Sequence, residues 1–123
     1  MEEEKKTHDF QRKITFQKRL EESKKILAKH PNRIPIIIEK SETCKTIEDI
    51  DKKKFLVPHD LTLGQLMYVV RKRLKTLSAE TGLFFFINDT MQPASALLTQ
   101  IYNNHKHDDG FLYILYSSEN TFG

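Results

Sequence analysis

The chain has 123 residues, 38% of them hydrophobic and including eight Phe and four Tyr, so it can bury one modest core and predicts a single domain. Charged residues make up 30% of it, no apolar run approaches the roughly 20 residues that cross a bilayer, and its first residues do not resemble a signal peptide. We therefore expect a soluble, cytosolic protein. The net charge of +3 falls far short of a dedicated nucleic-acid binder, and the single cysteine, Cys44, excludes an internal disulfide or a multi-cysteine zinc site.

Residues 15–29 predict an amphipathic helix, because apolar residues recur near helical spacing among charged ones and Pro31 ends the pattern. An ordinary solvated helix face explains the charges, although the basic excess within residues 1–30 also favours anionic membranes or acidic partners. Residues 1–14 are highly charged, with Phe10 and Ile14 as apolar anchors. They are expected to form a mobile arm or a short helix.

Two strands are predicted next. The β-branched run at residues 33–39 suits a strand covered on both faces. A polar turn separates it from a second short strand, Lys54–Pro58. Because proline lacks an N–H, the proline that closes this segment favours an edge strand, to which another strand can pair.

A second helix is expected to start at Leu63. Thr62 and Gln65 have the spacing of a capping box, and Leu61 can pack on Leu66 as a hydrophobic staple. The helix is expected to end near Gly82. Its buried stripe is predicted to consist of Leu63, Leu66, Val70, Leu74 and Leu77.

The rest of the chain predicts two strands around a short helix. The apolar run at residues 83–87, followed by Asn88 and Asp89, predicts a buried strand that turns into a tight hairpin. Ser95 is a candidate cap for a short helix over residues 97–102. Residues 110–116 carry the strongest strand pattern.

The order helix, strand, strand, helix, strand, short helix, strand belongs to the α+β class, and the helix from Leu63 must cross the sheet between the second and third strands. This is the β-grasp order of ubiquitin-like folds. We therefore divide the chain into an N-terminal arm and helical extension (residues 1–30), a ubiquitin-like core (residues 31–117) and a flexible C-terminal tail (residues 118–123).

Five ordered blocks of sequence carry a resemblance to a known family. The blocks are His30-Pro-Asn-Arg-Ile-Pro35, Asp51-Lys-Lys-Lys-Phe-Leu-Val-Pro58, Arg71-Lys-Arg73, Phe84-Phe-Phe86 and Asp109-Gly-Phe-Leu-Tyr113. They resemble the autophagy-related ubiquitin-like modifiers, the family of microtubule-associated protein light chain 3 and the gamma-aminobutyric-acid-receptor-associated protein. The resemblance covers residues 10–123 and implies a ubiquitin-like β-grasp with two additional N-terminal helices.

The resemblance also implies that the chain is the substrate of a conjugation cascade. In that family an activating enzyme adenylates the terminal glycine carboxylate, which passes between cysteines as a thioester and is amidated to phosphatidylethanolamine. Gly123 is then the conjugated residue, and Phe122 is recognised by the processing and conjugating enzymes. A residue without a Cβ suits the close approach of a catalytic cysteine. The sequence leaves open whether Gly123 is the encoded terminus or a trimmed one.

The implied partners are the activating and conjugating enzymes, a deconjugating cysteine protease and cargo receptors with an aromatic-x-x-aliphatic motif. The protein is expected to be a cytoplasmic monomer that resides on autophagosomes and related vesicle membranes when lipidated. The alternative is a peptide-binding module that is never conjugated and acts in vesicle trafficking or cytoskeletal attachment.

The predicted edge strand is the second functional surface, because a partner peptide can pair with it and place alternate side chains in pockets. By resemblance, the aromatic side chain of the motif enters a pocket lined by Glu22, Ile26, Pro35, Ile37, Lys54, Leu56 and Phe111. The aliphatic side chain enters a second pocket lined by Phe55, Val57, Pro58, Leu61, Leu66 and Val69. Plain core packing explains Ile37, Leu66 and Val69 equally well.

Four basic residues are predicted to contact acidic residues that flank the motif of the partner. They are Arg33, Lys52, Lys53 and Arg73. Such pairs would raise the association rate and make binding sensitive to salt. Protection of an edge strand against aggregation explains the lysines equally well.

We predict no catalytic machinery, no cofactor and no metal site, and hence a protein that is not an enzyme. Cys44 lies in a polar stretch without an identifiable His or charged partner and is interpreted as a bystander thiol. The segment His105-Lys-His107-Asp-Asp109 contains metal-ligating residue types. Because Lys106 lies within it and no other ligand set is evident, we interpret it as a solvated turn.

Overall fold

The computed structural model describes residues 8–118, so Phe122 and Gly123 lie outside the described residues. Along the described chain the elements are α1 (Asp9–Lys13), α2 (Phe16–Lys29), β1 (Arg33–Lys40), β2 (Lys54–Pro58), α3 (Leu63–Arg73), β3 (Phe84–Phe86), α4 (Leu98–His105) and β4 (Leu112–Ser117). The order predicted from the sequence is confirmed. Of the two readings of the N-terminal segment, its described part forms the short helix α1.

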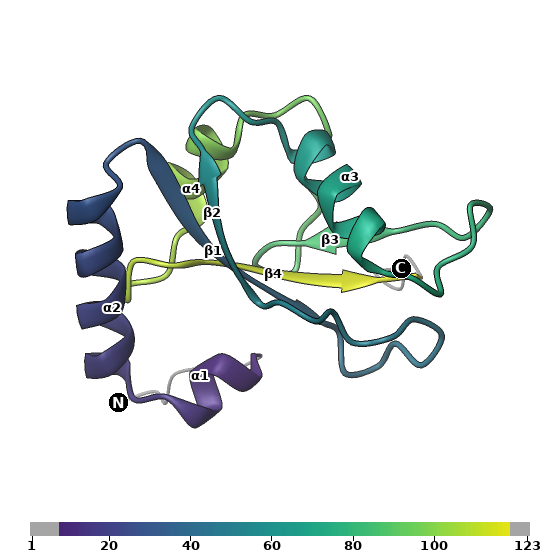
Figure 1. Ribbon diagram of the computed structural model, residues 1–123, viewed down its shortest axis with the longest axis horizontal. Helices are drawn as coiled ribbons and strands as arrows, with labels where there is room; N and C mark the ends of the chain where they lie inside the picture. Colours follow the sequence, from purple (N-terminus) through teal and green to yellow (C-terminus); the bar gives the residue numbers. More distant parts are fainter. Residues whose placement is uncertain (1–7, 119–123) are drawn as a thin grey trace.

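The strands form one mixed sheet in the order β2-β1-β4-β3 (Figure 1). β1 pairs antiparallel with β2 and parallel with β4, and β3 pairs antiparallel with β4. Residues 34–39 of β1 are all buried, as expected for a strand covered on both faces. β2 is at an edge of the sheet, which confirms the prediction from its closing proline.

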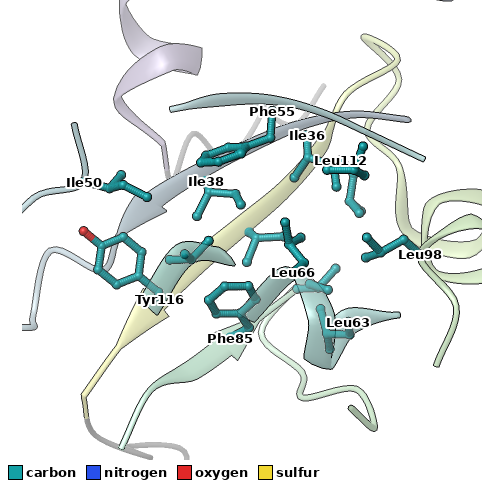
Figure 2. Close-up of a cluster of buried hydrophobic side chains, with 14 of the residues drawn as sticks. Ile36, Ile38, Ile50, Phe55, Leu63, Leu66, Phe85, Leu98, Leu112 and Tyr116 are labelled. Carbon is teal, nitrogen blue, oxygen red and sulfur yellow. The ribbon is translucent and has the colours of Figure 1, made fainter. Parts of the chain in front are cut away.

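Helices cover the two faces of the sheet unequally. α3 and α4 enclose the main apolar core on one face, and Figure 2 shows Leu66 in the middle of it. α1 and α2 lie against the other face (Figure 1), where a smaller cluster contains Phe10, Ile37, Phe111 and Tyr113. The fold is therefore a ubiquitin-like core of the α+β class with two additional N-terminal helices.

Side-chain caps set the start of the two longest helices. The Thr15 hydroxyl accepts the Lys18 N–H at the start of α2. At the start of α3, Thr62 Oγ1 accepts the Gln65 N–H at 3.2 Å and Gln65 Oε1 accepts the Thr62 N–H at 2.8 Å. The predicted capping box is confirmed, because both orphan N–H groups find a partner.

The predicted end of this helix, Gly82, is wrong, since α3 ends at Arg73. Leu74 leaves the helical conformation, at φ −90° and ψ 90°, and still packs in the core. The Arg71 guanidinium donates to the Thr81 carbonyl at 2.8 Å and holds the loop that follows. Leu77 packs against the core from this loop instead of from the helix.

The predicted cap Ser95 is also wrong. α4 begins after Leu97 and has no side-chain cap. Its start is fixed by backbone pairing with the segment before α3, where Leu63 donates to Ala96 and Leu98 donates to Leu61, both at 2.9 Å. Long-range pairing replaces the local cap here.

The hairpin predicted after β3 is confirmed only in its tight turn. Asn88 and Asp89 have φ values of 52° and 61°, which short polar residues tolerate best. The turn joins only the isolated bridge between Ile87 and Thr90, so no second strand follows it. β3 pairs with β4 instead.

Candidate functional site

The backbone of the edge strand β2 offers two residues to a further strand. Ile38 donates to the Lys53 carbonyl at 2.8 Å, so these two residues form a hydrogen-bonded pair of the β1–β2 ladder. Hydrogen-bonded pairs alternate along an antiparallel ladder. The register then places Lys54 and Leu56 at the non-bonded positions, opposite Ile37 and Pro35, with their N–H and C=O groups turned toward the open edge. Because Pro35 stands at a non-bonded position, its missing N–H removes no hydrogen bond from the β1–β2 ladder.

The residues predicted to line the aromatic pocket come from α2, β1, β2 and the segment before β4, and two of them form an ion pair. The Lys54 ammonium, on β2, contacts the Glu22 carboxylate on α2. Beneath this pair, Ile37 and Phe111 are fully buried, and Ile26 packs against them. Both charged groups are more than one-third exposed, so solvent screens the pair and little energy opposes its opening.

Helix α1 contacts two of the residues predicted to line this pocket. The Phe10 ring packs edge-on against Phe111, with centroids 5.4 Å apart. The Lys54 ammonium also lies 5.7 Å from the centroid of the Phe10 ring. Two residues predicted for the aromatic pocket are therefore in contact with α1, a link that the sequence did not reveal.

The residues predicted for the aliphatic pocket divide between core and surface. Phe55, Val57 and Leu66 are buried in the main core, and Leu66 has no exposed surface. Val69 is 41% exposed on α3, while Pro58 is exposed at the end of β2 and Leu61 is half-buried. Exposed, half-buried and fully buried residues are therefore mixed in this predicted set, and the aliphatic pocket itself stays a prediction.

The four predicted flanking cations differ in their partners. Lys53 contacts Asp9 at 3.0 Å and Glu39 at 2.9 Å, and the hydrogen bond with Glu39 raises the pKa of its ammonium group. Arg73 contacts Asp51 at 3.1 Å. Lys52 and Arg33 have no acidic partner within the part of the chain that the structure describes: the Lys52 ammonium lies over the Phe55 ring, and Arg33 donates to the Leu56 carbonyl at 3.3 Å.

A buried ion pair joins α2 to the start of β4. Arg19 and Asp109 are both fully buried, and the Arg19 Nη1 lies 2.7 Å from Asp109 Oδ2. The predictions of a solvated helix face for Arg19 and a solvated turn for Asp109 are therefore wrong at these two residues. Two residues so far apart in sequence carry no local signal of their pairing, although Asp109 lies in a block that resembles the family.

Asp109 receives further hydrogen bonds. Tyr113 donates its hydroxyl to Oδ2 at 2.6 Å, and the Phe111 N–H donates to Oδ1 at 2.9 Å. Burial by itself raises the pKa of the Asp109 carboxyl, but the neighbouring His107 imidazole and these two donors outweigh it and hold the pKa below its usual range. The carboxyl therefore stays ionised at neutral pH and pairs with the Arg19 guanidinium.

The two histidines of the segment 105–109 are candidate metal ligands by residue type. His105 and His107 are half-buried, and Asp108 is exposed. Between residues 8 and 118, no group of three or more His, Cys, Asp or Glu side chains could hold a metal ion.

Cys44 is buried in the main core, although its sequence neighbours are polar. Its sulfur lies 3.6 Å from the Ser118 hydroxyl and 3.8 Å from the Thr46 hydroxyl. Burial raises the pKa of the thiol, but hydrogen bonds from Ser118 and Thr46 outweigh it and lower the pKa to about 6. The thiol is thus more acidic than the sequence suggests, yet almost shielded from solvent.

Comparison with known proteins decides the family. A family model described as "Autophagy protein Atg8 ubiquitin like" matches residues 18–123. The chain belongs to the Atg8 family. It is 54% identical over 114 residues to Autophagy-related protein 8 of Kluyveromyces marxianus, covering 93% of this chain and 90% of the relative. Autophagy-related protein 8b of Arabidopsis thaliana is 51% identical over 116 residues, covering 94% and 93% of the two chains.

A solved structure agrees with this family. The crystal structure of Trypanosoma brucei ATG8 matches with a TM-score of 0.86 and 46% identity, covering 96% of this chain and all of the other, 100%. This match and the Atg8 family model confirm the ubiquitin-like fold predicted from the sequence. Within residues 8–118, the structure contains no helix that is long and apolar enough to cross a membrane.

Proposed function

We propose that this Atg8-family chain is a modifier whose Gly123 carboxyl is amidated to phosphatidylethanolamine, and that it acts in autophagosome formation. The observation that carries the proposal is the family match, which runs through residue 123. Lipidation would hold the protein on autophagosomal membranes. The activating, conjugating and deconjugating enzymes of the pathway would be its partners.

The chemistry requires three transfers of one acyl group. ATP activates the Gly123 carboxylate as an adenylate, with release of pyrophosphate. A cysteine thiolate displaces AMP to form a thioester, and after passage to the conjugating enzyme the phosphatidylethanolamine amine displaces that thiolate to form the amide. Gly123 supplies the carboxyl without a Cβ to obstruct the thiolate, and Phe122 is the adjoining contact for the enzymes.

The same chain would also act as an adaptor through its edge strand. A receptor peptide would pair with the outward N–H and C=O groups of Lys54 and Leu56. Its aromatic side chain would displace the Lys54–Glu22 ion pair and rest on Ile26, Pro35, Ile37 and Phe111, and its aliphatic side chain would rest on Val69, Pro58 and their neighbours. Lys52 and Arg33 would contact its acidic flanks, with Lys53 and Arg73 available after exchange of their internal partners.

The test of conjugation is intact-mass spectrometry. The chain is incubated with ATP, activating and conjugating enzymes from its own source, and liposomes that contain phosphatidylethanolamine. A mass gain of one phosphatidylethanolamine minus water is expected, and it is absent with Gly123→Ala or with liposomes of phosphatidylcholine alone. No gain with enzymes that lipidate a known relative in the same buffer would overturn conjugation.

The test of the groove is calorimetric titration with a peptide that contains Phe-x-x-Leu after two acidic residues. Leu56→Asp, at a half-buried position of β2, should weaken binding at least about tenfold, since it places a charge beside the aromatic ring. Tyr68→Asp, on a neighbouring exposed position of α3 outside the groove, is the matched control and should change little. Binding without conjugation would favour the alternative of a peptide-binding module; equal effects of the two variants would contradict the groove.

A further inference from the structure

One histidine lies buried under the first helix. His8 precedes α1 and is only 3% exposed. Its Nε2 lies 3.0 Å from the Ile114 carbonyl of β4, and its ring packs edge-on against Tyr113 with centroids 4.9 Å apart. Because a carbonyl oxygen only accepts, Nε2 carries the hydrogen and donates it. The neutral imidazole thus already makes this bond, and protonation would add a buried charge at Nδ1.

The charged groups around His8 come from every element beside it. Asp9 and Arg12 lie on α1, Glu39 lies on β1, and Lys53 precedes β2. Burial is the largest influence and lowers the pKa of His8; the Ile114 bond and Glu39 oppose it, and Arg12 and Lys53 add to it. Tyr113 keeps its proton, since burial and Asp109 raise its pKa.

A cavity of about 420 Å³ also borders His8, together with Gln11 of the same helix and the Tyr113 ring. The other titratable or charged side chains that line it are Asp89, His105, Lys106, His107 and Asp108. Both signs of charge are therefore present around this cavity.

α1 is too short to persist without its contacts. It has five residues, and isolated helices of this length are unstable in water. Besides His8, its contacts include Phe10 on Phe111, the pair of Asp9 with Lys53 at 3.0 Å, and the pair of Arg12 with Glu42 at 2.7 Å. Lys13 and then Lys53 hold the pKa of Asp9 below its ordinary value, so Asp9 keeps its charge where an imidazole titrates.

We propose that His8 is a pH-sensitive latch, which holds α1 on the sheet as a neutral imidazole and releases it when a proton from solvent binds Nδ1. Release would take Phe10 off Phe111 and separate Asp9 from Lys53. An apolar surface of Ile37, Phe111 and Tyr113 would then be uncovered. The proposal goes beyond conjugation and peptide binding and depends on neither.

Linkage gives the direction and the limit of the effect. In the released helix His8 has its ordinary pKa of about 6.5. In the docked helix the pKa lies lower, so the released state binds more protons. Docking is therefore complete above the ordinary pKa and weakens as the pH falls through it. From pH 7 to pH 5 the released population can rise at most about 25-fold, if the docked imidazole stays neutral.

Hydrogen–deuterium exchange of the full chain at pH 7.0 and 5.0 tests the latch, after correction for the intrinsic pH dependence of exchange. The wild type should lose protection over residues 9–14 by up to about 25-fold, while β1 stays protected. His8→Gln keeps an N–H donor for Ile114 without titrating, and His8→Phe keeps a ring on Tyr113. Both should lose the pH response, whereas His59→Gln, an exposed control, should keep it.

Two results would overturn the proposal. One is equal protection of residues 9–14 at both pH values in the wild type. The other is a pH response that survives in a His8 variant whose α1 is docked at pH 7. If neither variant docks α1, a pH titration of the wild type followed by nuclear magnetic resonance decides. The chemical shifts of the His8 ring and of the α1 amides must then change with the same midpoint pH, and different midpoints would refute the latch. Neither peptide nor lipid is present, so failure here leaves the proposed function unaffected.

Discussion

The two faces of the sheet are stabilised by different kinds of interaction. On the face covered by α3, an extended cluster of aliphatic and aromatic side chains excludes water. On the face covered by α1 and α2, the apolar cluster is small, and buried polar residues lie beside it. These polar residues are His8, Gln11, Arg19, Ser23, Glu39 and Asp109. The first face depends on buried area, and the second depends on correct pairing of polar groups.

The difference matters because buried polar groups stabilise only when they are paired. Among residues 8–118, no buried side-chain nitrogen or oxygen lacks a hydrogen-bond partner. The α1 and α2 face therefore has a defined geometry, but each partner that is removed leaves another group unpaired. The α3 face should respond to lost volume instead, independently of charge.

The largest expected effect is on the polar face. Asp109→Ala leaves the Arg19 guanidinium buried without its carboxylate and removes an acceptor from Phe111 and Tyr113. We expect the free energy of unfolding to fall by about 3 to 5 kcal/mol. Urea denaturation followed by circular dichroism measures it, with Asp108→Ala, an exposed neighbour, as the control. Similar losses for both variants would contradict the difference between the faces.

A double variant sharpens this result. Arg19→Met with Asp109→Asn removes both charges and keeps an amide oxygen for the Phe111 N–H. It should be more stable than Asp109→Ala, because no buried charge is left unpaired. A double variant as unstable as the single one would show that the cost arises from packing.

The matching change on the apolar face is Leu66→Ala. Leu66 is fully buried in the main core, so the substitution should lower the free energy of unfolding by about 3 kcal/mol. Val69→Ala, three positions later on α3 and 41% exposed, should cost less than about 1 kcal/mol. The loss at Leu66 should be the same at low and high salt in urea denaturation; dependence on salt would mean that charges also act on this face.

An intermediate effect is expected where α2 meets β4. Gly110 has a φ of 91°, and a Cβ there would contact the Ser23 side chain. Gly110→Ala should therefore cost about 1 to 3 kcal/mol, measured by thermal and urea denaturation. Adding Ser23→Ala removes the hydroxyl from the crowded position and separates crowding from backbone strain. If Gly110→Ala costs the same free energy of unfolding with and without Ser23→Ala, the positive φ is the cause. If it costs nothing in either background, neither crowding nor backbone strain acts at this position.

The smallest effect is expected at an exposed pair of α1. Arg12 and Glu42 are in contact at 2.7 Å, but their side chains are 41% and 71% exposed. Glu42→Gln should change the free energy of unfolding by less than about 1 kcal/mol and should leave α1 docked at pH 7. Loss of exchange protection over residues 9–14 in this variant would mean that the surface pair, and not the buried His8, holds the helix.

Local patterns predicted those elements that local interactions determine. The capping box of Thr62 and Gln65 and the edge position of Lys54–Pro58 both follow from neighbouring residues, and both are confirmed. Two of the incorrect predictions involve partners far along the chain. Arg19 is buried because Asp109 receives it, and α4 needs no Ser95 cap because Leu98 bonds Leu61.

For the candidate site, the edge strand is confirmed, and the pocket residues stay predictions. The resemblance named the groove residues, and the edge strand that they line is present. The sequence could not indicate that Lys54 is paired with Glu22, that Lys53 is paired with Asp9, or that Phe10 lies against Phe111. Those contacts depend on where α1 and α2 pack, which charged, weakly periodic helices do not determine by themselves.

The position of β4 has a consequence for biosynthesis. β4 is the last strand along the described chain, yet it lies between β1 and β3 in the sheet. As the chain leaves the ribosome, β1 keeps one edge without a partner and β3 has no strand partner at all until residues 112–117 emerge. Unpaired edges of this kind invite association between nascent chains. The sheet can therefore close only after residues 112–117 have been translated.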